Sequence, residues 1–145
     1  MSLKNLLGIS LDGITADKAH VAKLIAAAER NIADAQLQGL STENRFDAAY
    51  KAIMQLATVA LNAHGYRTLT SKPGHHQTAI QTLPLTVGLP RPKVIVLDAL
   101  RKQRNLADYS GDLVPEAIAA ECLANAKELR AHVRGWLEAN KRDLL

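Results

Sequence analysis

The sequence predicts an all-α protein, an up-and-down bundle of four to five helices with one long irregular connection at about residues 65–92. Apolar residues make up 48% of the 145 positions but aromatic residues only 3%, and Ala and Leu supply most of the apolar mass, which suits close helix packing. Apolar residues recur with the helical period, and no segment sustains the alternation of a strand. The length indicates a single domain over residues 1–145.

Two helices are expected in the first part of the chain. The first covers about residues 16–38, with Thr15 as its N-cap and Gly39 at its end. The second follows the N-cap Ser41 and stops at Gly65, with apolar residues at matching helical spacing. A short turn between them predicts an antiparallel hairpin.

The connection at residues 65–92 holds seven of the thirteen Gly and Pro residues, so it is expected to be mostly loop, with one short helix at about His75–Leu83. The fourth helix starts near Arg91 or Pro92 and runs to about Asp108, followed by a turn at residues 109–112. The fifth begins at Pro115 and reaches about Asn140, with a continuous apolar stripe that predicts a core helix.

The net charge of +4 is concentrated in one segment. Residues 91–104 contain five basic residues and one acidic residue: Arg91, Lys93, Arg101, Lys102, Arg104 and Asp98. This segment accounts for the whole excess of positive charge. A localised basic stretch can attract partners that carry phosphate. The alternative is a solvated helix face.

A helical projection of the fourth helix assigns its faces. The apolar residues expected on the buried side are Val94, Val96, Ala99, Leu100 and Ala107. The neighbouring flank carries Leu97, Arg101, Arg104 and Asp108. Arg104 is therefore expected at the edge of the apolar stripe, where its stem packs while its head faces a groove. Asn105 turns toward solvent, and the ring of Tyr109 is expected to fold back toward Arg104.

A family resemblance rests on these residues. The chain has two helices, a loop with Gly65-Tyr66-Arg67 and Gly74-His75-His76, a fourth helix with Arg101-x-x-Arg104-Asn105-x-x-x-Tyr109, and a final Ala-rich helix. This order resembles the HEPN domains of prokaryotes, over a core of about residues 16–137. The resemblance implies a homodimer, a role in toxin–antitoxin or defence systems, and a nucleotidyltransferase as protein partner.

The catalytic signature of HEPN ribonucleases is an Arg, a polar residue and, a few positions after the Arg, a His. Arg104 and Asn105 match the first two positions, but Tyr109 stands where the His is expected. Tyr109, with an ordinary pKa of about 10, is a poor general base at neutral pH, although it can donate a hydrogen bond or stack on a base. The resemblance thus implies that RNA or a nucleotide binds at a dimer groove through Arg101, Lys102, Arg104, Asn105, Asp108 and Tyr109.

Two alternatives stay open. In the first, the chain is a metal-independent endoribonuclease toxin in which Arg104 and Tyr109 are catalytic, or in which His75 or His76 of the loop replaces the missing His. In the second, the chain is a non-catalytic module that binds a nucleotidyltransferase partner, for which Tyr109 is a modification acceptor. Whether the chain is an enzyme is left undecided by the sequence.

Other classes of site are not expected. His64, His75 and His76 have no Cys or paired carboxylate at ligand spacing, so no metal site is predicted, and no phosphate-binding or dinucleotide glycine pattern predicts a cofactor. Cys122 lies in the apolar stripe of the fifth helix and is expected to be a buried small residue. No apolar stretch approaches the roughly 20 residues of a membrane span. No secretory signal is recognised, and the single cysteine suits a reducing compartment, so a cytoplasmic location is expected.

Overall fold

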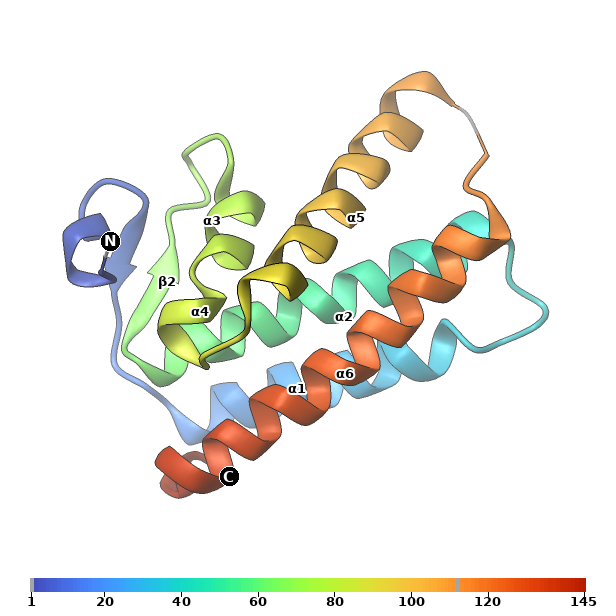
Figure 1. Cartoon of the computed structure of the whole chain (residues 1–145). Helices are drawn as coiled ribbons and strands as arrows, with labels where there is room; N and C mark the ends of the chain where they lie inside the picture. The colour runs from blue at the N-terminus through green and yellow to red at the C-terminus, as the bar shows by residue number, and fades with distance from the viewer. Residues whose placement is uncertain (1, 112) are drawn as a thin grey trace.

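The computed structural model describes residues 2–111 and 113–145, apart from the side chain of Tyr109. The described part contains six α-helices and a two-stranded sheet (Figure 1), so the expected all-α class is confirmed. The helices are α1 (Lys18–Asp34), α2 (Thr42–Ala63), α3 (His75–Gln81), α4 (Leu83–Thr86), α5 (Arg91–Ser110) and α6 (Glu116–Asn140). The strands are β1 (Leu11–Gly13) and β2 (Tyr66–Thr68), and short 3-10 turns lie at Lys4–Leu6 and Arg142–Leu144.

Helix α2 is the buried centre of the fold. Twelve of its 22 residues are buried, which leaves few positions on its surface for solvent. Both α1 and α6 run along it, while β2, α3 and α4 lie beside its C-terminal half (Figure 1). Large side chains such as Phe46, Ile53 and Leu56 fill the core, and the alanines between them allow the neighbouring helices to approach closely.

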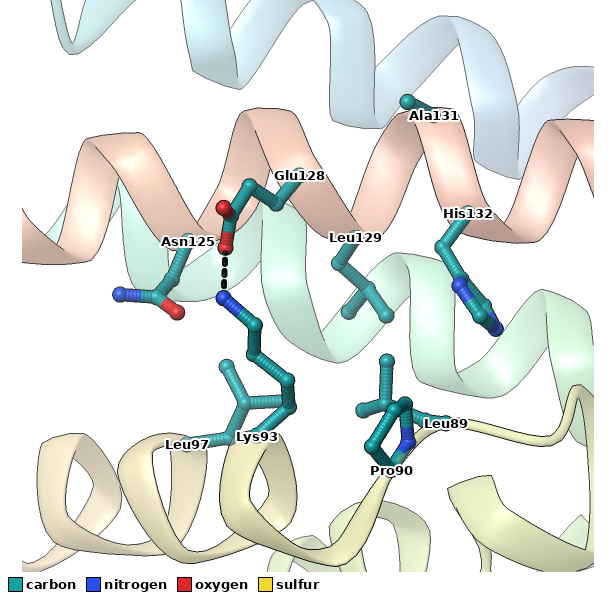
Figure 2. A pocket seen from close by; sticks show the side chains of 9 residues that line it. All are labelled: Leu89, Pro90, Lys93, Leu97, Asn125, Glu128, Leu129, Ala131 and His132. Carbon is teal, nitrogen blue, oxygen red and sulfur yellow. Dashed lines mark hydrogen bonds and ion pairs between the residues drawn. The ribbon is translucent and has the colours of Figure 1, made fainter.

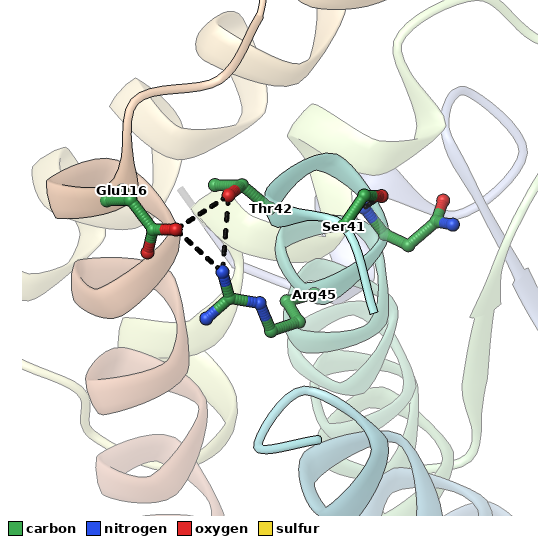
Figure 3. Close-up of polar contacts among 5 residues, drawn as sticks. Ser41, Thr42, Arg45 and Glu116 are labelled. Atoms are coloured by element: carbon green, nitrogen blue, oxygen red, sulfur yellow. Dashed lines mark hydrogen bonds and ion pairs between the residues drawn. The ribbon is translucent and has the colours of Figure 1, made fainter. Parts of the chain in front are cut away.

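A polar cluster joins the first turns of α2 and α6 (Figure 3). The Ser41 Oγ caps α2 by accepting a hydrogen bond from the backbone N–H of Asn44 at 3.2 Å, as the sequence predicts. Thr42 Oγ1 and Arg45 Nη2 each donate to Glu116 Oε1 at 2.8 Å. These contacts fix the register between two helices that are far apart in the sequence.

Helix α1 is shorter than the expected helix over residues 16–38. Its N-cap is Asp17 rather than Thr15, because the Asp17 Oδ1 accepts a hydrogen bond from the Ala19 N–H at 3.1 Å. The helix ends at Asp34, and the next residues form tight turns instead of a further helical turn. The expected boundaries at both ends were therefore wrong by a few residues.

The boundaries of the later helices agree better. The expected short helix divides into α3 and α4, which are separated by Thr82. Helix α5 continues through residue 109 to Ser110, so the expected turn at residues 109–112 begins later than predicted. The C-cap of α5 is Gly111, whose φ of +73° is the left-handed conformation common at helix C-termini. Asp112 lies outside the described residues.

The two strands were not expected from the sequence. They pair antiparallel, with Asp12 opposite Arg67, and the Arg67 Nη2 lies 3.0 Å from the Asp12 Oδ2. Each strand has three residues, which is too short to show an alternating pattern. The core also extends beyond the expected limits of residues 16–137, because Leu11 and Leu144 are both buried.

Candidate functional site

The inward face of α5 changes from apolar to basic halfway along the helix. Leu97 and Leu100 are each 3% exposed. Arg101 and Arg104 continue the same stripe one turn later, with side chains 15% and 34% exposed. The expected buried side was partly wrong, because Ala99 is exposed and Leu97 is buried in its place. Because apolar residues occur on both faces of α5, the helical projection placed the predicted buried stripe too far toward the outer face.

Arg104 packs against the centre of the fold. Its Cζ lies 5.0 Å from the centroid of the Tyr50 ring, and its Nε lies 4.0 Å from the Asp47 Oδ1. Its ion-pair partner is thus Asp47 on α2 and not Asp108, four residues along the same helix. Among the described residues, the terminal Nη1 and Nη2 of Arg104 have no hydrogen-bond partner. The predicted position at the edge of the apolar stripe is confirmed, and the forked end of the guanidinium remains available.

Arg101 and Lys102 share one carboxylate. The Arg101 Nε donates to Asp98 Oδ1 at 2.8 Å, and the Lys102 Nζ lies 3.5 Å from Asp98 Oδ2. Burial disfavours the charged form of Asp98, but the hydrogen bond from Arg101 and the two positive charges outweigh it and lower the pKa of the carboxyl. The main ion-pair partner of Arg101 is therefore Asp98. Lys102 makes the longer contact, and its side chain is 68% exposed to solvent.

A histidine reaches the same place from a distant part of the sequence. The Oη of Tyr50 and the Nδ1 of His76, the second residue of α3, share a hydrogen bond of 3.0 Å. Burial is the main cause that lowers the pKa of His76, and electrostatic repulsion from His75, Arg104 and Arg101 lowers it further. The imidazole is therefore neutral at pH 7. We call Tyr50, His76, Arg101 and Arg104 the arginine–histidine cluster.

Tyr50 and Asp47 complete the electrostatics of the cluster. Burial raises the pKa of Tyr50 to about 12, against the opposing charge of Arg104, so the phenol stays protonated. Burial also raises the pKa of Asp47, again against Arg104, which indicates that the long contact between them compensates desolvation poorly. A protonated hydroxyl, a neutral imidazole and a guanidinium lie together, and this set can bind a phosphate and transfer a proton.

The remaining predicted site residues are less closely involved. Asn105 and Asp108 are exposed on α5, and Asp108 is near enough to Asp47 for its charge to raise the pKa of that carboxyl. The predicted contact between Tyr109 and Arg104 lies outside the described residues. Tyr50 was missed as a site residue, because its spacing on α2 indicates a core position, which it also occupies. One signal in the sequence could have indicated it: a tyrosine at a core position needs a hydrogen-bond partner for its hydroxyl.

A groove of about 510 Å³ runs between α5 and α6 (Figure 2). Leu89, Leu97 and Leu129 form its apolar floor, and the Lys93 Nζ reaches across to the Glu128 Oε2 at 2.7 Å. The ion pair closes the groove on one side and also neutralises a cation of the basic segment. We interpret this groove as a gap left by the packing of α5 against α6, and not as a ligand site.

Metal and thiol chemistry find little support. Within residues 2–111 and 113–145, no group of three or more His, Cys, Asp or Glu side chains is placed to hold a metal ion. Cys122 is fully buried, as expected, and burial raises the pKa of its thiol to about 12, so it is no nucleophile at neutral pH. No described helix is both long and apolar enough to span a bilayer.

Comparison of the chain with models of known protein families, with curated proteins and with solved structures gave no match. The HEPN resemblance therefore stays a prediction.

The electrostatic coupling within this cluster is open to direct measurement. Replacing Arg104 with Ala removes a positive charge that disfavours the imidazolium, so the pKa of His76 should rise toward its ordinary value. The matched control is Lys102→Ala, which removes a charge from the same helix but one that does not act on His76. Titration of the His76 Hε1 resonance by NMR measures both effects. An unchanged titration in Arg104→Ala would contradict the proximity of the two residues.

Proposed function

We propose that this chain is a HEPN-like module that binds the phosphate backbone of RNA at the arginine–histidine cluster. The observation that carries the proposal is the position of Arg104, stacked on the Tyr50 ring with its terminal nitrogens unpartnered among the described residues. A guanidinium fork is a good geometric match for two phosphate oxygens. Its position over the Tyr50 ring also restrains the side chain, which lowers the entropy that binding would otherwise cost.

The surroundings of Arg104 favour an anion. His76 and Tyr50 supply further hydrogen-bonding groups, and Arg101 adds positive charge beside them. The cluster is half buried, and a charge interaction there is stronger than one in open solvent. Much of the basic segment is already paired within the chain, through Lys93 with Glu128 and Arg101 with Asp98. We therefore assign most of the binding free energy to Arg104.

The substitution Arg104→Ala tests the binding site. Binding of a fluorescent single-stranded RNA, followed by anisotropy at several salt concentrations, should weaken by roughly tenfold, with the salt slope reduced by about one. Arg30→Ala is the matched control, because Arg30 is an exposed arginine on α1 and its loss should leave affinity unchanged. If affinity does not depend on salt, the cluster does not contact phosphate and the proposal is wrong.

A second candidate function is metal-independent cleavage of RNA, and the placement of His76 favours it. When Nδ1–H donates to the Tyr50 Oη, the lone pair on the His76 Nε2 is free to accept a proton from a ribose 2′-hydroxyl. The 2′-oxygen then bonds to phosphorus and the bond from phosphorus to the 5′-oxygen breaks, with water protonating the leaving oxygen. Arg104 would stabilise the crowded phosphorane. In the other tautomer, His76 only donates a hydrogen bond.

Cleavage should depend on His76 but not on metal. With RNA and a chelator, the wild type is expected to yield fragments that end in 2′,3′-cyclic phosphate, at a rate that falls as the pH drops through the lowered pKa of His76. The variant His76→Gln keeps a hydrogen-bonding group for Tyr50, so it should retain RNA binding and lose cleavage. Equal cleavage by both proteins, or none by the wild type, would rule out this role and leave a binding module.

The proposed homodimer has a suitable surface on the outer face of α5. Ile95, Ala99, Lys102 and Leu106 follow one another at spacings of four, three and four residues, the pattern of a helix-pairing seam. Ile95 is 70% and Leu106 is 62% exposed, which is unusual for such side chains. This seam lies opposite the stripe that carries Arg104, so pairing through it would leave each cluster within its own protomer instead of in a shared groove.

The seam predicts the effect of a charge on oligomeric state. In light scattering coupled to size-exclusion chromatography, Leu106→Glu should shift a dimeric wild type to a monomer, because a buried carboxylate without a partner is strongly disfavoured. Leu113→Glu is the control, since Leu113 is 80% exposed and lies beyond α5. A dimer that persists in Leu106→Glu would place the interface elsewhere.

The wider biological role rests on the HEPN resemblance alone. We propose on that basis a part in a toxin–antitoxin or defence system, a nucleotidyltransferase as protein partner and a cytoplasmic location.

A further inference from the structure

A polar seam runs along the otherwise buried helix α2. Lys51, Gln55, Thr58 and Asn62 follow one another at spacings of four, three and four residues, so they share one face of the helix. All four line a cavity of about 520 Å³ between α2, α3, β2 and the segment that leads into α1. This volume lies within the range of small-molecule sites. The most enclosed helix of the fold therefore turns its polar face toward a hollow instead of toward another helix.

One polar atom at the end of this seam lacks a partner. Asn62 is 2% exposed, and among the described residues its Oδ1 is buried without a hydrogen bond. Two other residues of this polar seam have hydrogen-bond partners: Gln55 Oε1 accepts from Asn31 Nδ2, and Thr58 Oγ1 donates to the Met54 carbonyl. An unpaired buried acceptor is rare in folded proteins. Asn62 lines the cavity, so a ligand N–H or O–H that reached its Oδ1 would supply the donor that the described part of the fold does not.

The donor groups of the lining favour an anion. Lys51, His20, His75 and His76 line the cavity, Arg67 also lines it but is paired with Asp12, and Asp17 is the one carboxylate among the described lining residues. The Oδ1 of Asp17 already accepts the Ala19 N–H at the start of α1. Several donors of this kind match the three terminal oxygens of a phosphate monoester better than the two oxygens of a carboxylate.

We propose that this cavity binds a small phosphate monoester that carries hydroxyl donors, such as a sugar phosphate. The phosphate lies toward Lys51 and the imidazoles of His20 and His75, and a ligand hydroxyl donates to the Asn62 Oδ1. The site differs from the RNA-binding face, because its ligand contacts the polar seam of α2 and the segment before α1 instead of Arg104. His76 lines the cavity and also bonds to Tyr50, so it is the residue that the two sites share.

Calorimetry with ribose 5-phosphate as the probe tests the proposal. Ribose 5-phosphate should bind more tightly than inorganic phosphate, and ribose should not bind, because both the charge and the donor are needed. Gluconate, which offers hydroxyls with a carboxylate, should bind at least tenfold more weakly. Failure of ribose 5-phosphate to bind at millimolar concentration, or a preference for gluconate, would overturn the proposal.

Three variants locate the site. Asn62→Leu should lower the affinity for ribose 5-phosphate at least tenfold while the melting temperature stays the same or rises, because a buried oxygen without a partner is removed. Lys51→Ala, an exposed position that the core does not need, should also lower it tenfold, and the exposed Lys23→Ala on α1 should not. Binding that both cavity variants leave unchanged would overturn the proposal. Arg104→Ala should keep ribose 5-phosphate affinity within threefold, so failure of RNA binding and failure of this site are distinguishable.

Discussion

The enclosure of α2 is the constraint on which the rest of the structure depends. Because most of its residues are buried, nearly every side chain on this helix either packs in the core or needs a polar partner. Tyr50 meets this requirement through its hydrogen bond with His76. The hydroxyl of Tyr50 thereby helps to hold α3, a helix of seven residues that is also anchored by the buried Ala79 and Ile80.

The electrostatic organisation follows from the same enclosure. Charged side chains cannot enter the core, so Arg104 places its guanidinium over the Tyr50 ring while its side chain stays 34% exposed. Among the other basic residues of the segment, Lys93 pairs with Glu128, and Arg101 and Lys102 share Asp98. The excess of four positive charges counted over residues 91–104 thus overstates the positive field of this face, because Glu128 and Asp47 lie outside the segment and offset two of its cations. One half-buried guanidinium counts for more than several exposed cations that are already paired.

The sequence predicts the helices well because their apolar residues recur over several turns, as they do along α2 and α6. It predicts Ser41 as an N-cap correctly but prefers Thr15 to Asp17, since both residue types cap helices and only the hydrogen bond decides. The strands escape prediction because a pair of three-residue strands depends on contacts between residues about 55 positions apart. The contact between His76 and Tyr50 is equally nonlocal, so the histidines could be noticed but not placed.

The single cysteine gives this fold a convenient internal reporter. Cys122 lies on α6 with its Sγ 3.9 Å from the Phe46 carbonyl oxygen of α2, and it is inaccessible in the closed protein. A thiol reagent can reach it only when these two helices separate, so its labelling rate in the native state counts the openings of the central helix pair. Kinetics of that kind can distinguish an opening that loosens α6 alone from one that disperses the entire core. Such a measurement needs no engineered cysteine, since the chain carries a single sulfhydryl.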